Sequence, residues 1–517
     1  QLEALGGVAT MVLTHRDDVA DHRRWARAFG CERWIHQADV DAAPDAERRL
    51  EGSEPFLLAD QLQLIPTPGH TAGSLVVVLG AERQVLFSGD HLWWNPQQQV
   101  VVASQRYCWW NWSEQLRSVE RLLDLAAPQL GMDRVTLRRI NMVSPAEMPY
   151  AAANAMVYDS GEFEAIMDQA LSLSNWSTFE ARRLHAQHQG RLRGIGLCCF
   201  LEVAGGILEE PADLRFHDDG TVSLCVGAQA MGQGHLATYP ALIAQRLGID
   251  VSRVRLMAGD SDQTPGIVAT VASRSTMMVG SAAALACDES IRRGQALAAQ
   301  HLEAALDDVH FQNGLFTVAG TDRSVHLLDL TRLSKANKAS NQVALPSLDN
   351  VAKFTSPSMT YPNGCHVCEV EIDPDTGHVE VVAYTAVDDV GVMLQPQVIE
   401  GQIMGGVAQG LGQALGERLR YDPQGQLLTG SFMDYAMPRA EDFPMFVTAL
   451  SEVPATNHPL GFRGGGEGGI TPALGVVMNA VVDALAGFGV THVEMPATPQ
   501  RVWQAIRDAS AAAPAGR

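Results

Sequence analysis

The stretch GHVEVVAYTAVDDVG, Gly377–Gly391, decides the fold class of the C-terminal part of this 517-residue chain. Its β-branched and aromatic residues predict a long strand. Just before it, GCHVCEVEID (Gly364–Asp373) alternates apolar and polar residues, as a second strand does. Ala-rich segments such as GSAAALACDESIRRGQALAAQHLEAAL (Gly280–Leu306) and GVVMNAVVDALAG (Gly475–Gly487) predict helices. Long strands interrupted by long helices indicate a mixed α+β fold.

The composition is that of a globular, core-burying protein, with 46% apolar and 19% charged residues. A chain of 517 residues exceeds one ordinary hydrophobic core, so we expect several domains. The net charge of −22 argues against nucleic acid and anionic membrane as partners, because both recruit Lys/Arg-rich faces. No run of about 18 apolar residues predicts a transmembrane helix. No secretory signal is recognisable, so we expect a cytoplasmic protein.

The chain divides by sequence texture into three predicted domains. Residues 1–125 alternate short apolar runs with polar helical ones, which predicts an α/β domain. Residues 126–332 and 333–517 carry the longer strands and helices of the α+β pattern. The polar, Pro-containing segment 333–350 is predicted to be a linker or a long loop. Because the chain begins at Gln1 within a helix-like stretch, we expect a fragment or a processed product.

The eight cysteines are sparse and most lie in apolar runs, so we expect reduced, buried thiols rather than a disulfide framework. Cys365 and Cys368 form a single CxxC without a second pair, inside the alternating strand quoted above. We therefore interpret them as strand residues and not as a metal site.

Potential metal ligands follow the predicted strands of residues 1–125. His15 and Asp17 lie two apart after the strand-like VATMVLTH (Val8–His15), so their side chains are expected to point the same way. Further residues of ligand type come at the start of the next helix and after two later apolar strands: Asp21, His22, His70 and Asp90. Nitrogen and oxygen ligands that converge from neighbouring loops suit a metal ion, so the sequence predicts a metal site here.

These motifs resemble those of the metallo-β-lactamase-fold hydrolases. THRDDVADH (Thr14–His22) is similar to that family's HxHxDH signature, with Asp17 where the second His is usual. PTPGHTAG (Pro66–Gly73) and SGDH (Ser88–His91) match the next two ligand motifs in order. The family's strands before His15 and its final His motif do not occur in this sequence. The resemblance implies a partial αββα sandwich over about residues 1–125.

The same resemblance implies a two-metal site. His15, Asp17 and His70 would hold one metal ion, and the second ion would be held by Asp21 and His22 and bridged to the first by Asp90. Such a pair, with zinc as the expected metal, would generate hydroxide for hydrolysis.

Glycine-rich segments mark a second candidate site in the C-terminal part. GFRGGGEGGITPAL (Gly461–Leu474) sets a single Glu, Glu467, among glycines whose backbone can approach a bulky ligand closely. MGQGH (Met231–His235) and ASRST (Ala272–Thr276) each precede a predicted helix, and a helix N-terminus suits a phosphate or another anion. EGQIMGGVAQGLGQAL (Glu400–Leu415) adds Gln402 and Gln409. Together these segments predict a large phosphorylated cofactor with a general base over it.

Ordered motifs from about Gly131 to Ile506 resemble the molybdopterin-binding large subunit of the xanthine dehydrogenase, aldehyde oxidase and carbon monoxide dehydrogenase family. The motifs are GMDRVTLRRINMVSPAEMPY, MGQGH, ASRST, TYPNGCHVCEVEIDPDTGHVEVVAYTAVDDVG, VIEGQIMGGVAQGLGQAL, LLTGSFMDYAMPRAEDFP, HPLGFRGGGEGG and MPATPQRVWQAI. Residues of about 128–517 thus look like the C-terminal half of such a subunit, and the family's N-terminal half has no counterpart in the sequence. The resemblance implies molybdopterin-binding α+β domains and a molybdenum–molybdopterin cofactor in a dinucleotide form.

What the resemblance implies chemically is molybdenum hydroxylation, in which water-derived oxygen enters an electron-poor carbon and hydride passes to the molybdenum centre. Glu467 matches the general base, and a carboxylate in a dry pocket has a raised pKa that suits proton transfer near neutral pH. Gln409 matches a residue near the metal's oxo ligand. The other matched positions imply cofactor binding by Gly232, Gln233, Gly234, Ser273, Arg274, Ser275 and Gly466.

The resemblance also implies partners. Because no four-Cys cluster pattern occurs in the sequence, separate iron–sulfur and FAD subunits are implied, together with a small-molecule substrate and an oligomeric assembly. Two alternatives stay open: a metal-dependent hydrolase formed by residues 1–125, and an inactive fusion of two truncated enzymes joined near residues 120–130. Bound molybdenum or zinc would separate these hypotheses.

Overall fold

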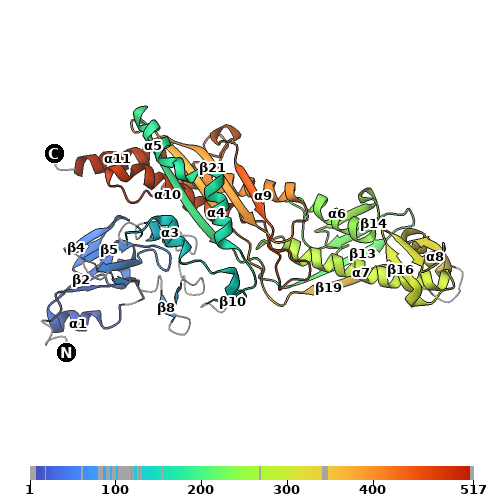
Figure 1. The fold of residues 1–517 in the computed structure, drawn as a ribbon. Coiled ribbons are helices and arrows are strands. Elements are labelled where there is room, and N and C mark those ends of the chain that lie inside the picture. Colours follow the sequence, from blue (N-terminus) through green and yellow to red (C-terminus); the bar gives the residue numbers. More distant parts are fainter. Residues whose placement is uncertain are drawn as a thin grey trace.

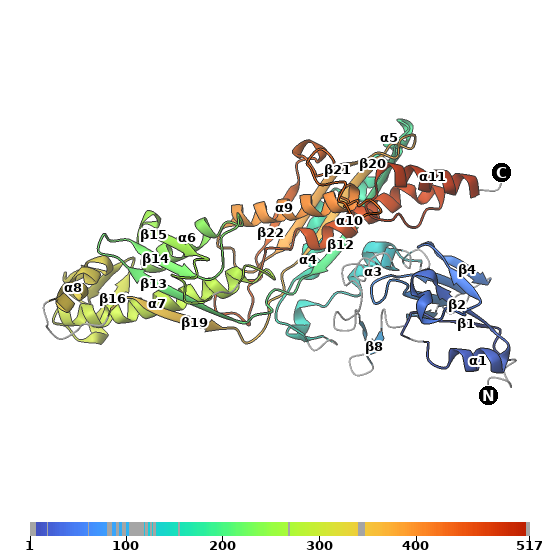
Figure 2. The ribbon, with the colours of Figure 1, turned by 180° about the vertical axis from the view of Figure 1, so that it is seen from behind.

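The computed structural model describes residues 7–17, 19–59, 62–79, 85–88, 93–95, 100–102, 118, 122–124, 127, 131–152, 156–266, 269–339 and 347–512. These residues form an elongated molecule with three lobes (Figure 1). The N-terminal lobe comprises the described part of residues 7–102, the central lobe residues 131–201 with 360–512, and the distal lobe residues 209–355. The N-terminal lobe lies beside the central lobe, and the distal lobe lies at the far end, as the view from behind also shows (Figure 2).

The central lobe is built on a four-stranded sheet of order β12-β20-β21-β22. Its middle is an antiparallel hairpin of the two strands that the alternating sequence predicts, β20 (Asn363–Ile372) and β21 (Val379–Asp389). β12 (Leu192–Leu201) pairs antiparallel with β20, and β22 (Val447–Ser451) pairs parallel with β21. The β-branched residues of the hairpin therefore lie between two neighbours, where both faces are covered.

Helices cover both faces of this sheet. α10 (Ile470–Leu485) packs on β12 and β20, with α9 (Pro396–Leu415) beside it, and α4 (Phe163–Leu173) packs on the opposite face against β20 and β21 (Figure 1). The periodic Val and Ala residues of α10 are buried against the sheet, as the Ala-rich pattern predicts. The other elements of the lobe are α3 (Arg134–Arg139), β10 (Tyr150–Ala151), β11 (Val157–Tyr158), α5 (Phe179–His188) and α11 (Pro499–Ala512).

The distal lobe has a sheet of order β15-β14-β13-β19 packed against α7 (Ser275–His301). Small side chains along α7, among them Ala282, Ala283 and Ala286, are fully buried and let the helix lie close to the sheet. The elements of this lobe are β13 (Glu209–Phe216), β14 (Val222–Val226), α6 (His235–Leu247), β15 (Val254–Ala258), β16 (Val309–Gln312), β17 (Leu315–Val318), β18 (Ser324–His326), α8 (Leu327–Ala339) and β19 (Asn350–Thr355).

The N-terminal lobe contains a parallel sheet β1-β2-β3 and an antiparallel sheet β4-β5-β6-β7. Its one described α-helix, α1 (His22–Phe29), ends at Gly30, a glycine C-cap in the left-handed region with φ of +65°. The strands are β1 (Thr10–Val12), β2 (Glu32–His36), β3 (Arg48–Leu50), β4 (Phe56–Ala59), β5 (Leu62–Pro66), β6 (Leu75–Leu79), β7 (Val85–Phe87), β8 (Trp93–Asn95) and β9 (Val100–Val102).

The predicted division at residues 332/333 does not follow the sheets. β19 lies after this point in the sequence but completes the distal sheet beside β13, and β12 lies before it but belongs to the central sheet. The predicted linker 333–350 is also corrected, because its first part continues α8 to Ala339 and its Leu348 is buried in the distal core. Within each lobe, pairing between strands that are far apart in the sequence overrides the local polar composition on which the prediction was based.

Cys365 and Cys368 are buried in β20, as expected of strand residues, and the described cysteines carry free thiols.

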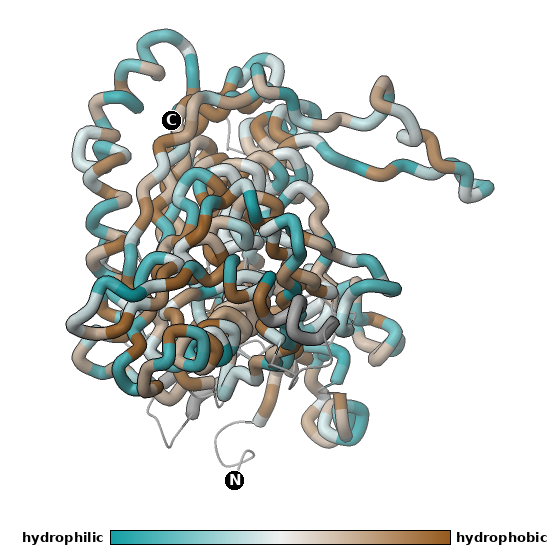
Figure 3. Tube along the Cα trace, turned by 90° about the vertical axis from the view of Figure 1, so that its right-hand side faces the viewer, coloured by the Kyte–Doolittle hydropathy of each residue, from teal (hydrophilic) through white to brown (hydrophobic). Residues whose placement is uncertain are grey.

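One segment, Ile470–Phe488, is long and apolar enough to cross a membrane by length and composition. It consists of α10 and the turn after it, and α10 packs on the central sheet with most of its apolar side chains buried. Such burial is typical of a core helix in a globular lobe. Many of the outermost turns of the chain are hydrophilic (Figure 3).

Close packing of β12 on α10 predicts a large effect for one methyl group. A Cβ atom at Gly196 would lie 2.0 Å from the Val476 carbonyl oxygen, so Gly196→Ala must push the strand and helix apart. We expect a loss of about 1–3 kcal/mol in the free energy of unfolding, measured by urea denaturation. Gly401→Ala in α9 is the matched control, because its Cβ would meet nothing within 4 Å and should add helix propensity. Equal stability of the two variants would contradict this packing.

Candidate functional site

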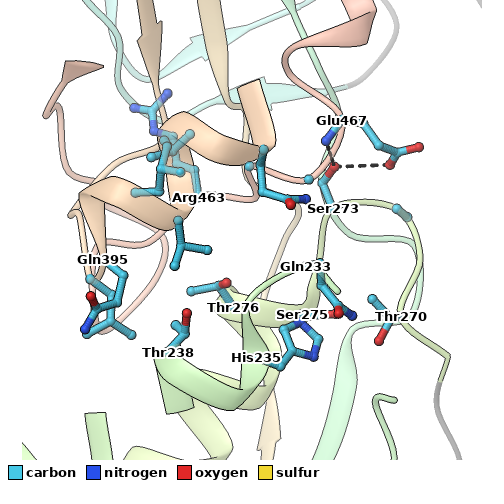
Figure 4. A pocket seen from close by; sticks show the side chains of 18 of the residues that line it. Gln233, His235, Thr238, Thr270, Ser273, Ser275, Thr276, Gln395, Arg463 and Glu467 are labelled. Atoms are coloured by element: carbon cyan, nitrogen blue, oxygen red, sulfur yellow. Dashed lines mark hydrogen bonds between the residues drawn. The ribbon is translucent and has the colours of Figure 1, made fainter. Parts of the chain in front are cut away.

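A cavity of about 370 Å³ lies where the central and distal lobes meet. The starts of α6 and α7 line it on the distal side, and α9, the turn after β21 and the glycine run 461–469 line it on the central side (Figure 4). A volume of this order is within the range of small-molecule and cofactor sites. Two lobes that converge on one cavity are a common location for such sites.

Two helix starts face this cavity. α6 begins after Gly234, which has φ of +86°, and α7 begins after Arg274. Neither start receives a side-chain cap from the part of the chain that the structure describes, and neither helix has an acidic residue in its first turn. The unsatisfied N–H groups and the positive end of each helix dipole therefore remain available to a negatively charged group.

His235, the first residue of α6, adds a polar group without a partner. Its side chain is almost fully buried, and its Nδ1 has no hydrogen-bond partner among the described residues. Burial lowers the pKa of His235 to about 4, so the ring is neutral near pH 7. Because buried polar atoms are normally hydrogen-bonded, an orphaned nitrogen on the wall of a cavity fits a polar ligand.

A strained turn carries Ser273 into the cavity. Ala272 and Ser273 have φ of +55° and +51°, in the left-handed region that residues other than glycine rarely adopt. The glycine run presses against this turn, since a Cβ atom at Gly464 would lie 2.2 Å from the Ser273 carbonyl oxygen. Glycine at position 464 is therefore required for the two segments to meet.

Glu467 is joined to Ser273 by two hydrogen bonds (Figure 4). The Ser273 hydroxyl donates to Glu467 Oε2 at 3.1 Å, and the Glu467 backbone N–H donates to Ser273 Oγ at 3.0 Å. Glu467 is exposed, so the dry pocket expected from the sequence is not formed by the described residues alone. Burial of this carboxylate would require a ligand or a further polypeptide over it.

Arg463 anchors the glycine run from behind. Its buried guanidinium donates to the carbonyl oxygens of Tyr361 (2.6 Å) and Ser160 (3.0 Å) and lies 3.6 Å from Asp389 Oδ2. Burial raises the pKa of Asp389, and the Arg463 charge opposes that rise. In the sequence Arg463 is only a charged residue among glycines. Its role in holding the glycine run could not be predicted, because its partners are far away in the chain.

The structure brings most of the predicted cofactor residues together. Gly232, with φ of +103°, and Gly234 shape the loop before α6. The residues that line the cavity itself are Gln233, Ser273, Ser275, Gly466 and Glu467.

Two predicted residues lie elsewhere. Arg274 is fully buried and donates to Glu210 Oε2 at 2.7 Å and to the Ile207 carbonyl oxygen at 2.8 Å, so it is committed to the distal core and not to the cavity. Gln409 is exposed on α9 and is not among the cavity-lining residues, whereas Gln402, about two turns earlier, is. Apolar and glycine residues occur on every face of α9, so the sequence alone did not show which face of this helix lines the cavity.

The Arg274–Glu210 pair yields a pH-dependent prediction. Burial raises the pKa of Glu210 and the Arg274 charge opposes the rise, so Arg274→Met leaves a buried carboxyl whose pKa is higher still. We expect Arg274→Met to lower the free energy of unfolding by about 3–5 kcal/mol at pH 8. The loss should shrink at pH 5, where Glu210 can take up a proton, as measured by urea unfolding at both pH values.

The double variant Arg274→Met/Glu210→Gln is the control for this pair. It removes the ionisable group, so its stability relative to the parent chain should vary less between pH 5 and pH 8. An equal loss for Arg274→Met at both pH values would contradict the assigned role.

The N-terminal lobe brings three predicted ligands together. The candidate ligand atoms of His15, Asp17 and His70 all lie within 4.8 Å of one another, with both His side chains buried. The fully buried Asp39 holds the two loops that carry them, because its carboxylate accepts hydrogen bonds from the backbone N–H groups of Arg16 and Gly73, each at 3.0 Å. This arrangement suits a single metal ion.

The predicted second-metal ligands do not join this cluster. His22 is buried with its Nδ1 3.0 Å from Arg33 Nη1, and burial beside that guanidinium lowers the pKa of His22. Asp21 is exposed with φ of +58° at the start of α1. A cation next to His22 opposes metal binding there, so the assignment of His22 and Asp21 is corrected. Asp90 lies outside the described residues.

Two convergent helix starts, an orphaned buried nitrogen and a carboxylate at the mouth of the cavity define a protein with a site for a large anionic cofactor. Residues 169–444, more than half of the chain, match the family described as "Molybdopterin cofactor-binding domain", and the chain belongs to this family.

The relatives include the large subunits of a dehydrogenase and a hydroxylase. The chain is 32% identical over 418 residues to the carbon monoxide dehydrogenase large chain of Hydrogenophaga pseudoflava, covering 78% of this chain and 52% of that one. It is 31% identical over 402 residues to the nicotine 6-hydroxylase large subunit of Paenarthrobacter nicotinovorans, covering 75% and 49%. Quinoline 2-oxidoreductase from Pseudomonas putida 86 superposes with a TM-score of 0.71 at 30% identity, covering 76% and 52%. The chain thus spans about half the length of the curated relatives it matches.

Proposed function

We propose that this chain is the cofactor-binding portion of a molybdenum hydroxylase, an oxidoreductase that adds water-derived oxygen to an electron-poor carbon of a small molecule. The observation that carries the proposal is the contact between the strained Ser273 turn and Glu467, which sets a carboxylate at the mouth of a cavity faced by two uncapped helix starts. Membership of the molybdopterin cofactor-binding domain family supports the same reading.

The residues present fit a molybdopterin cofactor. We propose the dinucleotide form of the cofactor. Its phosphate groups would be held at the starts of α6 and α7, where backbone N–H groups and positive helix ends can bind an anion. The orphaned His235 Nδ1 offers one further polar contact. When bound, the cofactor would supply the two-electron oxidation and the activation of water.

In this arrangement Glu467 acts as the general base. Its Oε2 is held by the Ser273 hydroxyl, and its Oε1 has no hydrogen-bond partner among the described residues, which leaves it able to accept a proton. The two hydrogen bonds to Ser273 fix the carboxylate at the cavity mouth and limit its motion. Gln402 and Arg463 also line the cavity on its central side, where they border the space for the substrate and cofactor.

The proposal extends to partners and location. Electrons would leave through separate iron–sulfur and FAD subunits, since the sequence carries no four-Cys cluster pattern. The exposure of Glu467 is consistent with a further polypeptide covering the cavity. We place the assembly, an oligomer, in the cytoplasm.

Molybdenum content tests the proposal directly. The chain, expressed in a host that makes the cofactor and purified with any copurifying subunits, should contain molybdenum by mass spectrometry and pterin by fluorescence after oxidation. Glu467→Gln should retain the metal but lower kcat for an aldehyde or N-heterocycle substrate by about 10²–10⁴-fold, because it removes the base and not the binding site. A preparation without molybdenum and without pterin would defeat the proposal.

The His15–Asp17–His70 cluster favours a second candidate function, a metal-dependent hydrolase activity in the N-terminal lobe with zinc as the expected metal. His70→Ala should abolish zinc binding measured by mass spectrometry, because it removes one of three clustered ligands. His185→Ala, at an exposed site on α5, should leave the zinc content unchanged. If the protein binds neither zinc nor molybdenum, the remaining alternative of an inactive fusion holds.

A further inference from the structure

Two free thiols face each other across the central sheet. Cys199 of β12 lies directly opposite Cys365 of β20 in the strand register, and their Sγ atoms are 3.5 Å apart. Both side chains belong to the apolar cluster on the face of the sheet that α4 covers. The neighbouring Cys198 belongs to the cluster on the opposite face, because side chains alternate along a strand. The function proposed above makes no use of the Cys199–Cys365 pair.

The backbone hydrogen bonds show that a covalent bond between these thiols fits the sheet. In an antiparallel ladder, opposite residues that exchange both backbone hydrogen bonds alternate with opposite residues that exchange none. Ala204 and Thr360 exchange both, at 2.9 and 3.0 Å, in the same register as β12 and β20. Cys199 lies an odd number of positions before Ala204, so it forms a non-hydrogen-bonded pair with Cys365. The Cα atoms of such a pair are about 4.5 Å apart, which is within the range of roughly 4.4–6.8 Å that disulfides span.

The two thiols differ in access to solvent. β12 is the outer strand of the central sheet, and Cys199 is partly exposed there. Cys365 lies in the next strand inward and is almost fully buried. Burial, and then the neighbouring Cys199 thiol, raise the pKa of Cys365. A reagent from solvent therefore meets Cys199 first, and Cys365 is placed to react with Cys199 afterwards.

β12 leads from this pair towards the cavity of the candidate functional site. Shortly after the strand ends, the Gly205 backbone N–H donates to the Ala272 carbonyl oxygen at 3.1 Å. Ala272 belongs to the strained turn that carries Ser273 into the cavity. A covalent bond between β12 and β20 would therefore fix the strand that supports this turn.

We propose that Cys199 and Cys365 form a reversible modification site, which small-molecule disulfides oxidise to an intramolecular disulfide. The Cys199 thiolate attacks one sulfur of the reagent, whose other half leaves as a thiolate, and a mixed disulfide forms at Cys199. The Cys365 thiolate then attacks Cys199 Sγ, and the second half of the reagent leaves. The two cysteines together lose two electrons and two protons, and the reagent is reduced to two thiols that take up these protons. The proposal is independent of molybdenum binding.

Oxidised glutathione, added to the full folded chain, tests the proposal. After the remaining thiols are trapped with iodoacetamide, peptide mass spectrometry should find Cys199 linked to Cys365, and excess dithiothreitol should reverse the link. Cys365→Ser should stop the reaction at a glutathione adduct on Cys199. Cys199→Ser should leave Cys365 unmodified, because that thiol is buried. Cys198→Ala is the matched control, since its side chain lies on the opposite face and the link should still form.

The parent chain alone decides the outcome, so the test does not depend on the folding of any variant. A parent chain in which Cys199 carries only glutathione would overturn the proposal. So would a chain in which Cys199 and Cys365 both stay unmodified, or one in which Cys199 is linked to another cysteine. None of these results bears on the molybdenum content, so the failure of this proposal and the failure of the proposed function are distinguishable.

Thermal unfolding gives an independent readout. A disulfide between residues 166 positions apart restricts the unfolded chain far more than the folded one. The Tm of the oxidised parent chain should therefore lie at least about 2 °C above that of the reduced parent chain. The same oxidation should leave the Tm of Cys199→Ser unchanged. Equal Tm values for the oxidised and reduced parent chains, with the link present, would contradict a bond that the native sheet accommodates.

Discussion

The contact between the glycine run and the Ser273 turn is the constraint on which the site depends. A side chain at position 464 would collide with the Ser273 backbone, and only this close approach lets the Ser273 hydroxyl reach Glu467. The two segments belong to different lobes, so the same contact also positions the starts of α6 and α7 against α9. Function and the arrangement of the lobes therefore rest on one piece of backbone packing.

Buried ion pairs hold the two sides of that contact. Arg463 ties the glycine run to β21 through Asp389, and Arg274 ties the following helix to β13 through Glu210. Arg274 lies next to residues that face the cavity and Arg463 lines the cavity, yet the charged groups of both pair with buried carboxylates. The uncapped helix starts at the cavity can attract an anion through their dipoles without exposed arginines.

The sequence predicted what depends on local pattern and missed what depends on distant partners. The β20–β21 hairpin, α7 and α10 followed from alternating and Ala-rich runs, and His15, Asp17 and His70 from their positions at strand ends. Arg274 could not be placed, because its partner Glu210 is 64 residues away. The lobe boundary was missed because β12 and β20 pair across a large separation, with Cys199 and Cys365 166 residues apart.

The central claim is that close packing of the glycine run on the Ser273 turn builds a molybdenum-cofactor site. The most direct measurement is the molybdenum and pterin content of Gly464→Ala beside that of Gly405→Ala, whose Cβ would meet nothing within 4 Å on α9. The account predicts that the first variant loses the cofactor and that the second keeps it at the level of the parent chain. Equal cofactor content in the two variants would contradict it.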